Sequence, residues 1–161
     1  MAVFNLEDCA TSRAPGRLLR RIDKIMSTYV ESKFEDLDLS FQHWVALKVV
    51  RDGVVGNAGE LARDLGITTG ATTRMIDVLE TRGLIARDRG GEDRRVVRLA
   101  VTPAGNDAVV KLQRHVVSAW NEAMADFTQD EADVLVNLLI KLLAAAERVA
   151  GGVVGGKEIE Q

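Results

Sequence analysis

The feature that most constrains the fold is the stretch from 59 to 102, in which two short helical patterns and a charged hairpin pattern follow one another. Asn57 and Glu60 have the spacing of a capping box, in which the Asn side chain accepts from a free backbone N–H and the Glu side chain reaches back. They predict a helix that runs to about Leu65 and ends at Gly66, where glycine can adopt a left-handed conformation.

A second helix follows after a turn of about three residues. Thr68 or Thr69 can cap its start, and Gly83 can occupy the left-handed position after its end. Its apolar face at i, i+3, i+4 and i+7 consists of Thr72, Met75, Ile76 and Leu79. The opposite face carries Thr69, Gly70, Thr73, Arg74 and Asp77.

Residues 84–89 and 96–101 alternate in polarity on either side of a Gly-Gly turn, which predicts a β-hairpin with a charged tip. An isolated hairpin is marginally stable, so this one requires a helix to pack against. Helix, turn, helix and hairpin in this order form a winged helix-turn-helix. Val54 and Val55 could add a minimal third strand, so we expect a wing of two to three strands.

Amphipathic helical patterns lie on both sides of this unit. We expect a mainly α fold with long N- and C-terminal dimerisation helices. In chain order the predicted parts are an N-terminal arm (1–16), a single domain (17–150) with dimerisation helices at about 17–36 and 103–150 around a winged helix-turn-helix at about 40–101, and a flexible tail (151–161).

Composition narrows the class of protein. The chain has 161 residues, is 47% hydrophobic and carries a net charge of −3, as expected for one soluble globular domain that does not coat nucleic acid non-specifically. Between Leu61 and Leu99, however, eight arginines face six acidic residues, a local surplus of two positive charges that leaves about −5 for the remainder. The first residues lack the pattern of a signal peptide, and no apolar run could span a membrane. We therefore expect a cytoplasmic protein.

The exposed face of the second helix has the chemistry of a helix that enters the major groove of DNA. Threonine offers a hydroxyl to base edges and a methyl to thymine, so Thr69 and Thr73 suit base contact. Gly70 permits close approach of the backbone, and Arg74 can reach a guanine edge or a phosphate. Asp77 is expected to orient Arg74 rather than to contact DNA.

The hairpin tip suits the minor groove, where a narrow A·T-rich segment attracts arginine. Arg94 or Arg95 is expected to insert, with Asp93 directing it through an ion pair. The alternative is a solvated charged turn, since hairpin tips are commonly charged.

Three segments, GELARDLGI, TRMIDVLETRGLI and EDRRVVRLAVTPAG, resemble the MarR family of bacterial winged-helix regulators. The resemblance extends over roughly residues 17–149. It implies a homodimer that binds a pseudo-palindromic operator, usually as a repressor, and that is released in many members by a small phenolic or other aromatic acid. By position it assigns DNA contacts to the residues already named: Thr69, Gly70, Thr73, Arg74, Asp93, Arg94 and Arg95. At Val78 this chain departs from the many relatives that carry a basic residue.

The residues themselves also favour a dimer. The two terminal helices carry more apolar surface than a compact winged-helix unit needs, and such surface is normally covered by a partner. Two-fold symmetry would separate the recognition helices by one DNA turn, about 34 Å.

An effector of the family type would contact His43, Trp44 and Arg87. Each also has a simpler interpretation: Trp44 as a core residue, His43 as a helix-start residue, and Arg87 as the partner of a nearby acid such as Asp77.

Two other functions stay open. Cys9 is a lone N-terminal cysteine, as in redox-sensing members of the family, although its acidic neighbours disfavour a reactive thiolate. The winged helix could instead bind protein rather than DNA. The sequence has no phosphate loop, nucleophile elbow or cysteine cluster, so we expect no enzyme activity, cofactor or metal.

Overall fold

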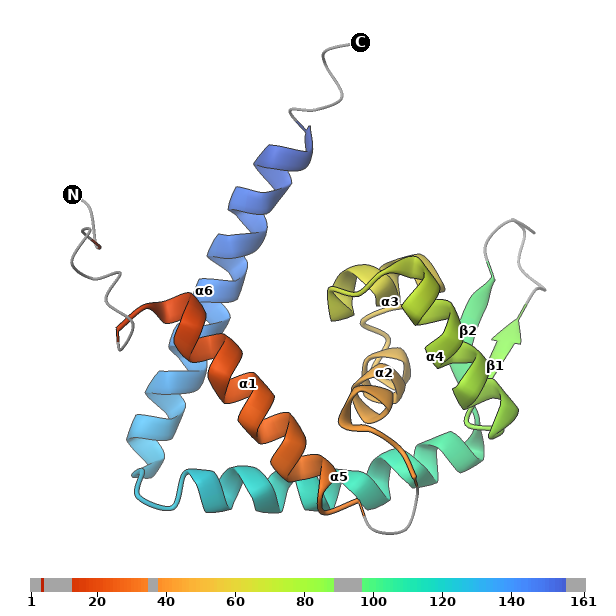
Figure 1. Ribbon diagram of the computed structural model, residues 1–161, viewed down its shortest axis with the longest axis horizontal. Coiled ribbons are helices and arrows are strands. Elements are labelled where there is room, and N and C mark those ends of the chain that lie inside the picture. Colours follow the sequence, from red (N-terminus) through yellow and green to blue (C-terminus); the bar gives the residue numbers. More distant parts are fainter. Residues whose placement is uncertain (1–3, 5–12, 35–37, 89–96, 156–161) are drawn as a thin grey trace. The chain divides into compact units, whose positions relative to one another are not determined.

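The computed structural model describes residues 4, 13–34, 38–88 and 97–155, with the backbone alone from 152 onward. The chain forms two compact units, Met1–Trp120 and Asn121–Gln161. Their elements are, in order, α1 (Pro15–Glu31), α2 (Phe41–Arg51), α3 (Ala58–Leu65), α4 (Thr69–Thr81), β1 (Ile85–Asp88), β2 (Arg98–Val101), α5 (Pro103–Ala123) and α6 (Gln129–Gly155), as Figure 1 shows.

The helix-turn-helix begins and ends at the predicted residues. The Asn57 side chain accepts from the backbone N–H of Glu60 at 3.0 Å, and Thr68 caps α4 by accepting from Ala71. Gly66 and Gly83 have φ angles of 63° and 69°, the left-handed conformation that ends each helix.

The capping box of α3 differs from the predicted one in the partner of the Glu60 side chain. The Glu60 carboxylate accepts from the backbone N–H of Gly56 at 2.6 Å, one residue before the cap residue Asn57. This hydrogen bond is also the main reason why the pKa of Glu60 lies below its ordinary value. The local interaction extends the cap into the preceding turn.

The two terminal helices also have different ends from those expected. α1 begins at Pro15, because proline has no N–H to leave unpaired at the first helical position. α6 continues to Gly155, whereas a flexible tail was expected from residue 151. Glycine lowers helix propensity but keeps its backbone N–H, so Gly151 does not block the helix as a proline would.

The core of the first unit is formed by the buried faces of α1 to α5 and of the hairpin. The predicted apolar face of α4 is buried as a whole, including Thr72, whose hydroxyl donates to the carbonyl of Thr68. The largest fully buried side chains are Leu47, Leu61, Ile76, Leu79, Ile85, Leu112, Val30, Val109 and Thr72.

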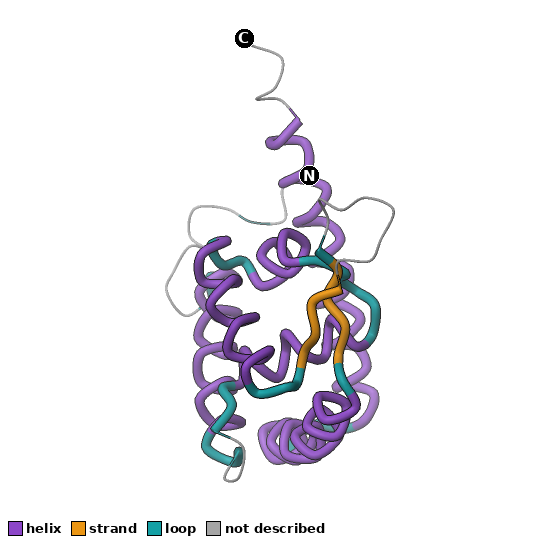
Figure 2. The backbone as a smooth tube through the Cα atoms, turned by 90° about the vertical axis from the view of Figure 1, so that its right-hand side faces the viewer, coloured by secondary structure: helices purple, strands orange, loops and turns teal. Residues whose placement is uncertain are grey.

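The hairpin is a two-stranded antiparallel sheet (Figure 2). In its register Ile85 pairs with Val101. The third strand considered for residues 54 and 55 is absent from the described sheet; a single bridge joins Asn57 to Arg98 instead. The reason is local, because the N–H groups of Val54 and Val55 both bond to the carbonyl of Val49 at the end of α2. They are therefore not available to a ladder.

The exit from the hairpin is tightly packed. A Cβ added to Gly105 would lie 2.1 Å from the Leu84 carbonyl oxygen and 2.7 Å from a methyl of Val101. The Thr102 hydroxyl accepts from the Gly105 N–H at 3.0 Å and donates to the Gly83 carbonyl at 2.6 Å. Only glycine fits where the first turn of α5 meets the loop after α4.

The second unit consists of the end of α5 and α6. A capping box opens α6, with the Glu131 carboxylate accepting from the Thr128 N–H at 2.8 Å. No side chain of α6 is buried between residues 129 and 151. Within the described chain no helix is both long and apolar enough to cross a membrane.

Candidate nucleic-acid interface

The outward face of α4 carries the four predicted contact residues of the recognition helix. Thr69, Gly70, Thr73 and Arg74 are all exposed, while the opposite face is buried. Because Thr68 caps the helix from outside, the first turn is free to present these residues. The structure therefore brings together the residues predicted for the second helix.

The Thr73 hydroxyl is oriented by its own helix. It donates to the carbonyl of Thr69 at 2.9 Å, which uses its single proton. Its remaining lone pairs and its methyl group are left for a partner. Thr73 can therefore accept from a base amino group or contact a thymine methyl, but it is not free to act as a donor.

Arg74 and Asp77 do not pair as expected. Asp77 binds Arg87, with 2.6 Å between its Oδ1 and the arginine Nη2. Within the described part of the chain, the Arg74 guanidinium forms no ion pair. Its charge is thus available on the outward face.

Arg87 joins the wing to the recognition helix. Its second terminal nitrogen binds the Glu80 carboxylate, so one guanidinium holds two acids of α4. The hydrogen bond to Asp77 is the largest cause of a raised Arg87 pKa, with burial opposing it and Glu80 adding to it. The ion pair considered for this arginine from the sequence is confirmed, and Glu80 is a partner that sequence reasoning missed.

A signal for this cluster was present in the sequence. Asp77 and Glu80 are three residues apart, which places them on neighbouring positions of one helix. Arg87 is two residues after the buried Ile85, so both share the strand face that packs toward the helices.

The predicted wing-tip residues Asp93, Arg94 and Arg95 lie outside the described residues, as does Cys9. Their roles stay predictions from the sequence.

His43 occupies a helix cap. Its Nδ1 accepts from the backbone N–H of Ser40 at 3.1 Å, while the Ser40 hydroxyl accepts from the His43 N–H at 3.2 Å. Burial lowers the pKa of His43, Arg82 lowers it further, and the carboxylates of Glu31 and Asp38 oppose these effects. The neutral ring is the form that can accept this hydrogen bond.

Trp44 is a core residue. It is buried, its ring stacks on Phe41 at 5.6 Å between centroids, and its Nε1 donates to the carbonyl of Val109 at 3.3 Å. His43 and Trp44 are neighbours on α2, whereas Arg87 is bound to α4.

The end of α4 is also bound to the loop before α2, through a contact that the sequence did not predict. Arg82 donates to the backbone carbonyl of Asp38 at 2.7 Å and pairs with its carboxylate at 2.8 Å. Asp38 has a φ of 43°, uncommon for a residue other than glycine. No spacing rule connects residues so far apart in the chain.

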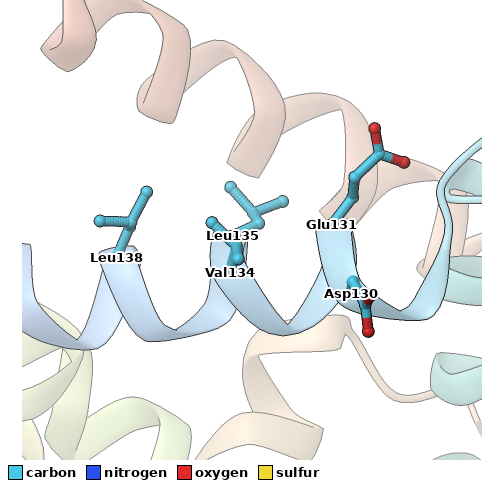
Figure 3. Close-up of a pocket in the computed structure, with 5 residues that line it drawn as sticks. All are labelled: Asp130, Glu131, Val134, Leu135 and Leu138. Carbon is cyan, nitrogen blue, oxygen red and sulfur yellow. The ribbon is translucent and has the colours of Figure 1, made fainter.

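A shallow apolar groove runs along α6. Figure 3 shows its lining side chains along this single helix, namely Asp130, Glu131, Val134, Leu135 and Leu138. Among the described residues, no group of three or more His, Cys, Asp or Glu side chains could hold a metal ion.

Comparison with known proteins shows which family and which solved structures the chain is similar to. The model of the MarR family matches residues 53–97, from the turn after α2 through α3, α4 and β1. The chain is similar to the apo form of wild-type MarR from E. coli at 26% identity, with 80% of this chain and 96% of that chain covered and a TM-score of 0.70.

Two further crystal structures share the fold. A mutant E. coli MarR complexed with operator DNA is 25% identical, with 87% of this chain and 99% of that chain covered and a TM-score of 0.70. The transcriptional regulator PA3341 is 25% identical, with 83% and 98% covered and a TM-score of 0.72. The family model and these structures agree on the same part of the chain: residues 53–97 match the MarR family, and the chain as a whole has the winged helix-turn-helix fold of the MarR structures to which it is similar.

Proposed function

We propose that the chain is a sequence-specific DNA-binding regulator that acts as a homodimer on a pseudo-palindromic operator, in the usual case as a repressor. The observation that carries the proposal is the outward face of α4, where two threonines, a glycine and the Arg74 guanidinium are exposed together. Small, hydrogen-bonding and cationic residues are what a helix in the major groove requires. The similarity to a MarR–operator complex supports the same function.

The test begins with duplexes selected from a randomised pool by the wild-type protein. Binding measured by fluorescence anisotropy should weaken steeply as salt rises, because phosphate contacts release counterions. Arg74→Ala should weaken binding by about 5- to 100-fold if it contacts a guanine, whereas Thr73→Ala should mainly blur sequence preference. Arg51→Ala removes the same charge from the end of α2 and serves as the control.

The predicted wing contacts are tested on the same duplexes. Replacing Arg94 and Arg95 by alanine should lower affinity on all A·T-flanked sites. If neither this double variant nor Thr73→Ala changes binding, DNA recognition by the winged helix is wrong and a protein-interaction module becomes the better proposal.

The dimer proposal is supported by the exposed apolar side chains of the terminal helices. On α6, Leu138 is 57% exposed and Leu143 is 62% exposed, and α1 exposes Ile22 and Ile25 in the same way. Apolar surface of this extent is normally covered by a partner. The groove in Figure 3 is part of the exposed apolar face of α6.

Sedimentation equilibrium should give twice the chain mass of 17.5 kDa. Leu138→Glu should shift the protein toward monomer, since it would bury an unpaired charge in the dimer. Val54→Glu is a matched control, because Val54 is 63% exposed in a loop of the other unit. A monomeric wild-type protein would contradict the proposal.

We further propose a small aromatic acid as the effector, with His43, Trp44 and Arg87 as its contacts. Such a ligand releases DNA only if it prefers a dimer with the wrong spacing of recognition helices. An acid at Arg87 would compete with the two carboxylates of α4. Calorimetry with salicylate and related aromatic acids tests the idea, and absence of any binding heat would remove it.

A further inference from the structure

Arg87 of β1 forms ion pairs with two acids of α4. These contacts indicate a role for Arg87 other than touching DNA or binding an effector. We propose that Arg87 is a positioning residue that sets the direction of the wing relative to the recognition helix, and thereby the preference for base pairs flanking the site. The inference rests on the proposed DNA-binding function. We call Asp77, Glu80 and Arg87 the α4–β1 clamp.

The geometry of the clamp restrains rotation. The two terminal nitrogens of Arg87 bind different carboxylates, Nη2 at 2.6 Å from Asp77 and Nη1 against Glu80. A planar guanidinium held at both nitrogens has a defined orientation, which the point charge of a lysine cannot reproduce. With 23% of its surface exposed, the Arg87 side chain is the least exposed member of the clamp.

The strand needs such a second attachment. β1 and β2 have four residues each, and within the described chain the edge of β2 is held only by the short contact with Gly56 and Asn57. Ile85 anchors β1 in the core at 2% exposure, but an apolar contact has no preferred direction. Arg87 lies two residues farther along, about 7 Å at the usual rise of a strand. The ladder holds β1 to β2, and Arg87 adds a second attachment of β1 to the helices beyond that of Ile85, near the end of the strand that leads to the wing tip.

The carboxylates have an electrostatic cost for DNA binding. Asp77 is 54% exposed on α4, one helical turn from Thr73 and near Arg74. An unpaired carboxylate there would repel phosphates. If Asp77 and Glu80 only repel the phosphates, removing both acids should strengthen DNA binding. If they hold Arg87 in position, removing both should reduce the preference for A·T flanks, and this difference provides the test.

The experiment uses the full-length protein and two duplexes: one selected by the wild type, and the same duplex with its A·T flanks changed to G·C. The readout is the dissociation constant for the G·C-flanked duplex divided by that for the A·T-flanked duplex, which is above one when A·T flanks are preferred. A loss of global stability would weaken binding to both duplexes and leave this ratio unchanged. Arg87→Ala should weaken binding to the A·T-flanked duplex on the order of tenfold and bring the ratio close to one. Arg87→Lys should fail to restore the ratio.

The decisive variant is Asp77→Asn combined with Glu80→Gln. It adds two positive charges in net terms, so a purely repulsive role predicts tighter binding with an unchanged ratio. The clamp predicts a reduced ratio despite the added charge. Arg51→Ala should keep the wild-type ratio, and thermal melting establishes that each variant is folded at the assay temperature.

The outcomes separate the two proposals. If the wild type binds no duplex, the proposed function fails. If the wild type binds with a flank preference that survives Arg87→Ala or the double acid variant, DNA binding stands and the positioning role of Arg87 is overturned.

Discussion

Replacing Gly70 by alanine should stabilise the protein and weaken DNA binding. Gly70 is the second residue of α4, and a Cβ built there meets no heavy atom within 4 Å. Its φ lies outside the left-handed region, so alanine fits the backbone without strain. Alanine lowers the conformational entropy of the unfolded chain, which should raise the free energy of unfolding by about 0.5 kcal/mol.

The effect on affinity has the opposite sign. The added methyl projects from the exposed face on which Thr73 and Arg74 lie. If the backbone at Gly70 approaches the edge of the major groove, the methyl occupies space that the packed interface needs. Overpacking costs about 1–3 kcal/mol in well-packed surroundings, which corresponds to about 5- to 150-fold in the dissociation constant.

Gly16→Ala is the matched control. Gly16 is the second residue of α1 after Pro15, and a Cβ added there also meets no heavy atom within 4 Å. Thermal unfolding should show a similar small gain for both variants, while anisotropy should show weaker DNA binding for Gly70→Ala alone. Equal affinity of Gly70→Ala and wild type would refute the close approach of α4 to DNA.

Three further predictions concern the fold that carries the interface. Gly105→Ala should lower the free energy of unfolding in urea by about 3 kcal/mol, since the nearest atom is the Leu84 backbone carbonyl at 2.1 Å; a loss below about 1 kcal/mol would contradict the close contact. His43→Gln keeps an acceptor for the Ser40 N–H but does not titrate. Because burial lowers the pKa of His43 from 6.5, the unfolded state takes up a proton first, and wild-type stability should fall relative to the glutamine variant as pH drops through 6.5. Parallel pH profiles of the two proteins in urea unfolding would disprove this account. Trp44→Phe removes the indole hydrogen bond to the Val109 carbonyl, which keeps its bond within α5, and should cost about 0.5–1.5 kcal/mol in the same assay, whereas an unchanged midpoint would mean that the hydrogen bond contributes nothing.

The helix boundaries of the helix-turn-helix were predictable because capping is local. Asn57 and Thr68 bond to N–H groups three residues ahead, and Gly66 and Gly83 end the helices through their own φ angles. Such signals depend on a few consecutive residues, and so does the apolar face of α4. The same reasoning failed at Val54, where the end of α2 competes for the backbone N–H groups.

The partners of the charged side chains were less predictable. Asp77 had two candidate arginines in the sequence, Arg74 on its own helix and Arg87 on the next strand. Helical spacing allowed the first pairing, and packing of β1 against α4 produced the second. Long side chains choose partners from whatever the fold brings near, so spacing along the chain does not decide between them.

The sequence by itself thus determined the order of elements, the ends of the central helices and the exposed face of α4, because these depend on short-range hydrogen bonds and on the 3.6-residue period. Tertiary structure alone decided that Arg82 lies near enough to His43 to lower its pKa, that Arg87 is clamped between two acids, and that Gly105 admits no Cβ. Each of these depends on the distance between elements separated in the chain. That distance follows from how the apolar faces pack, and no local pattern encodes it.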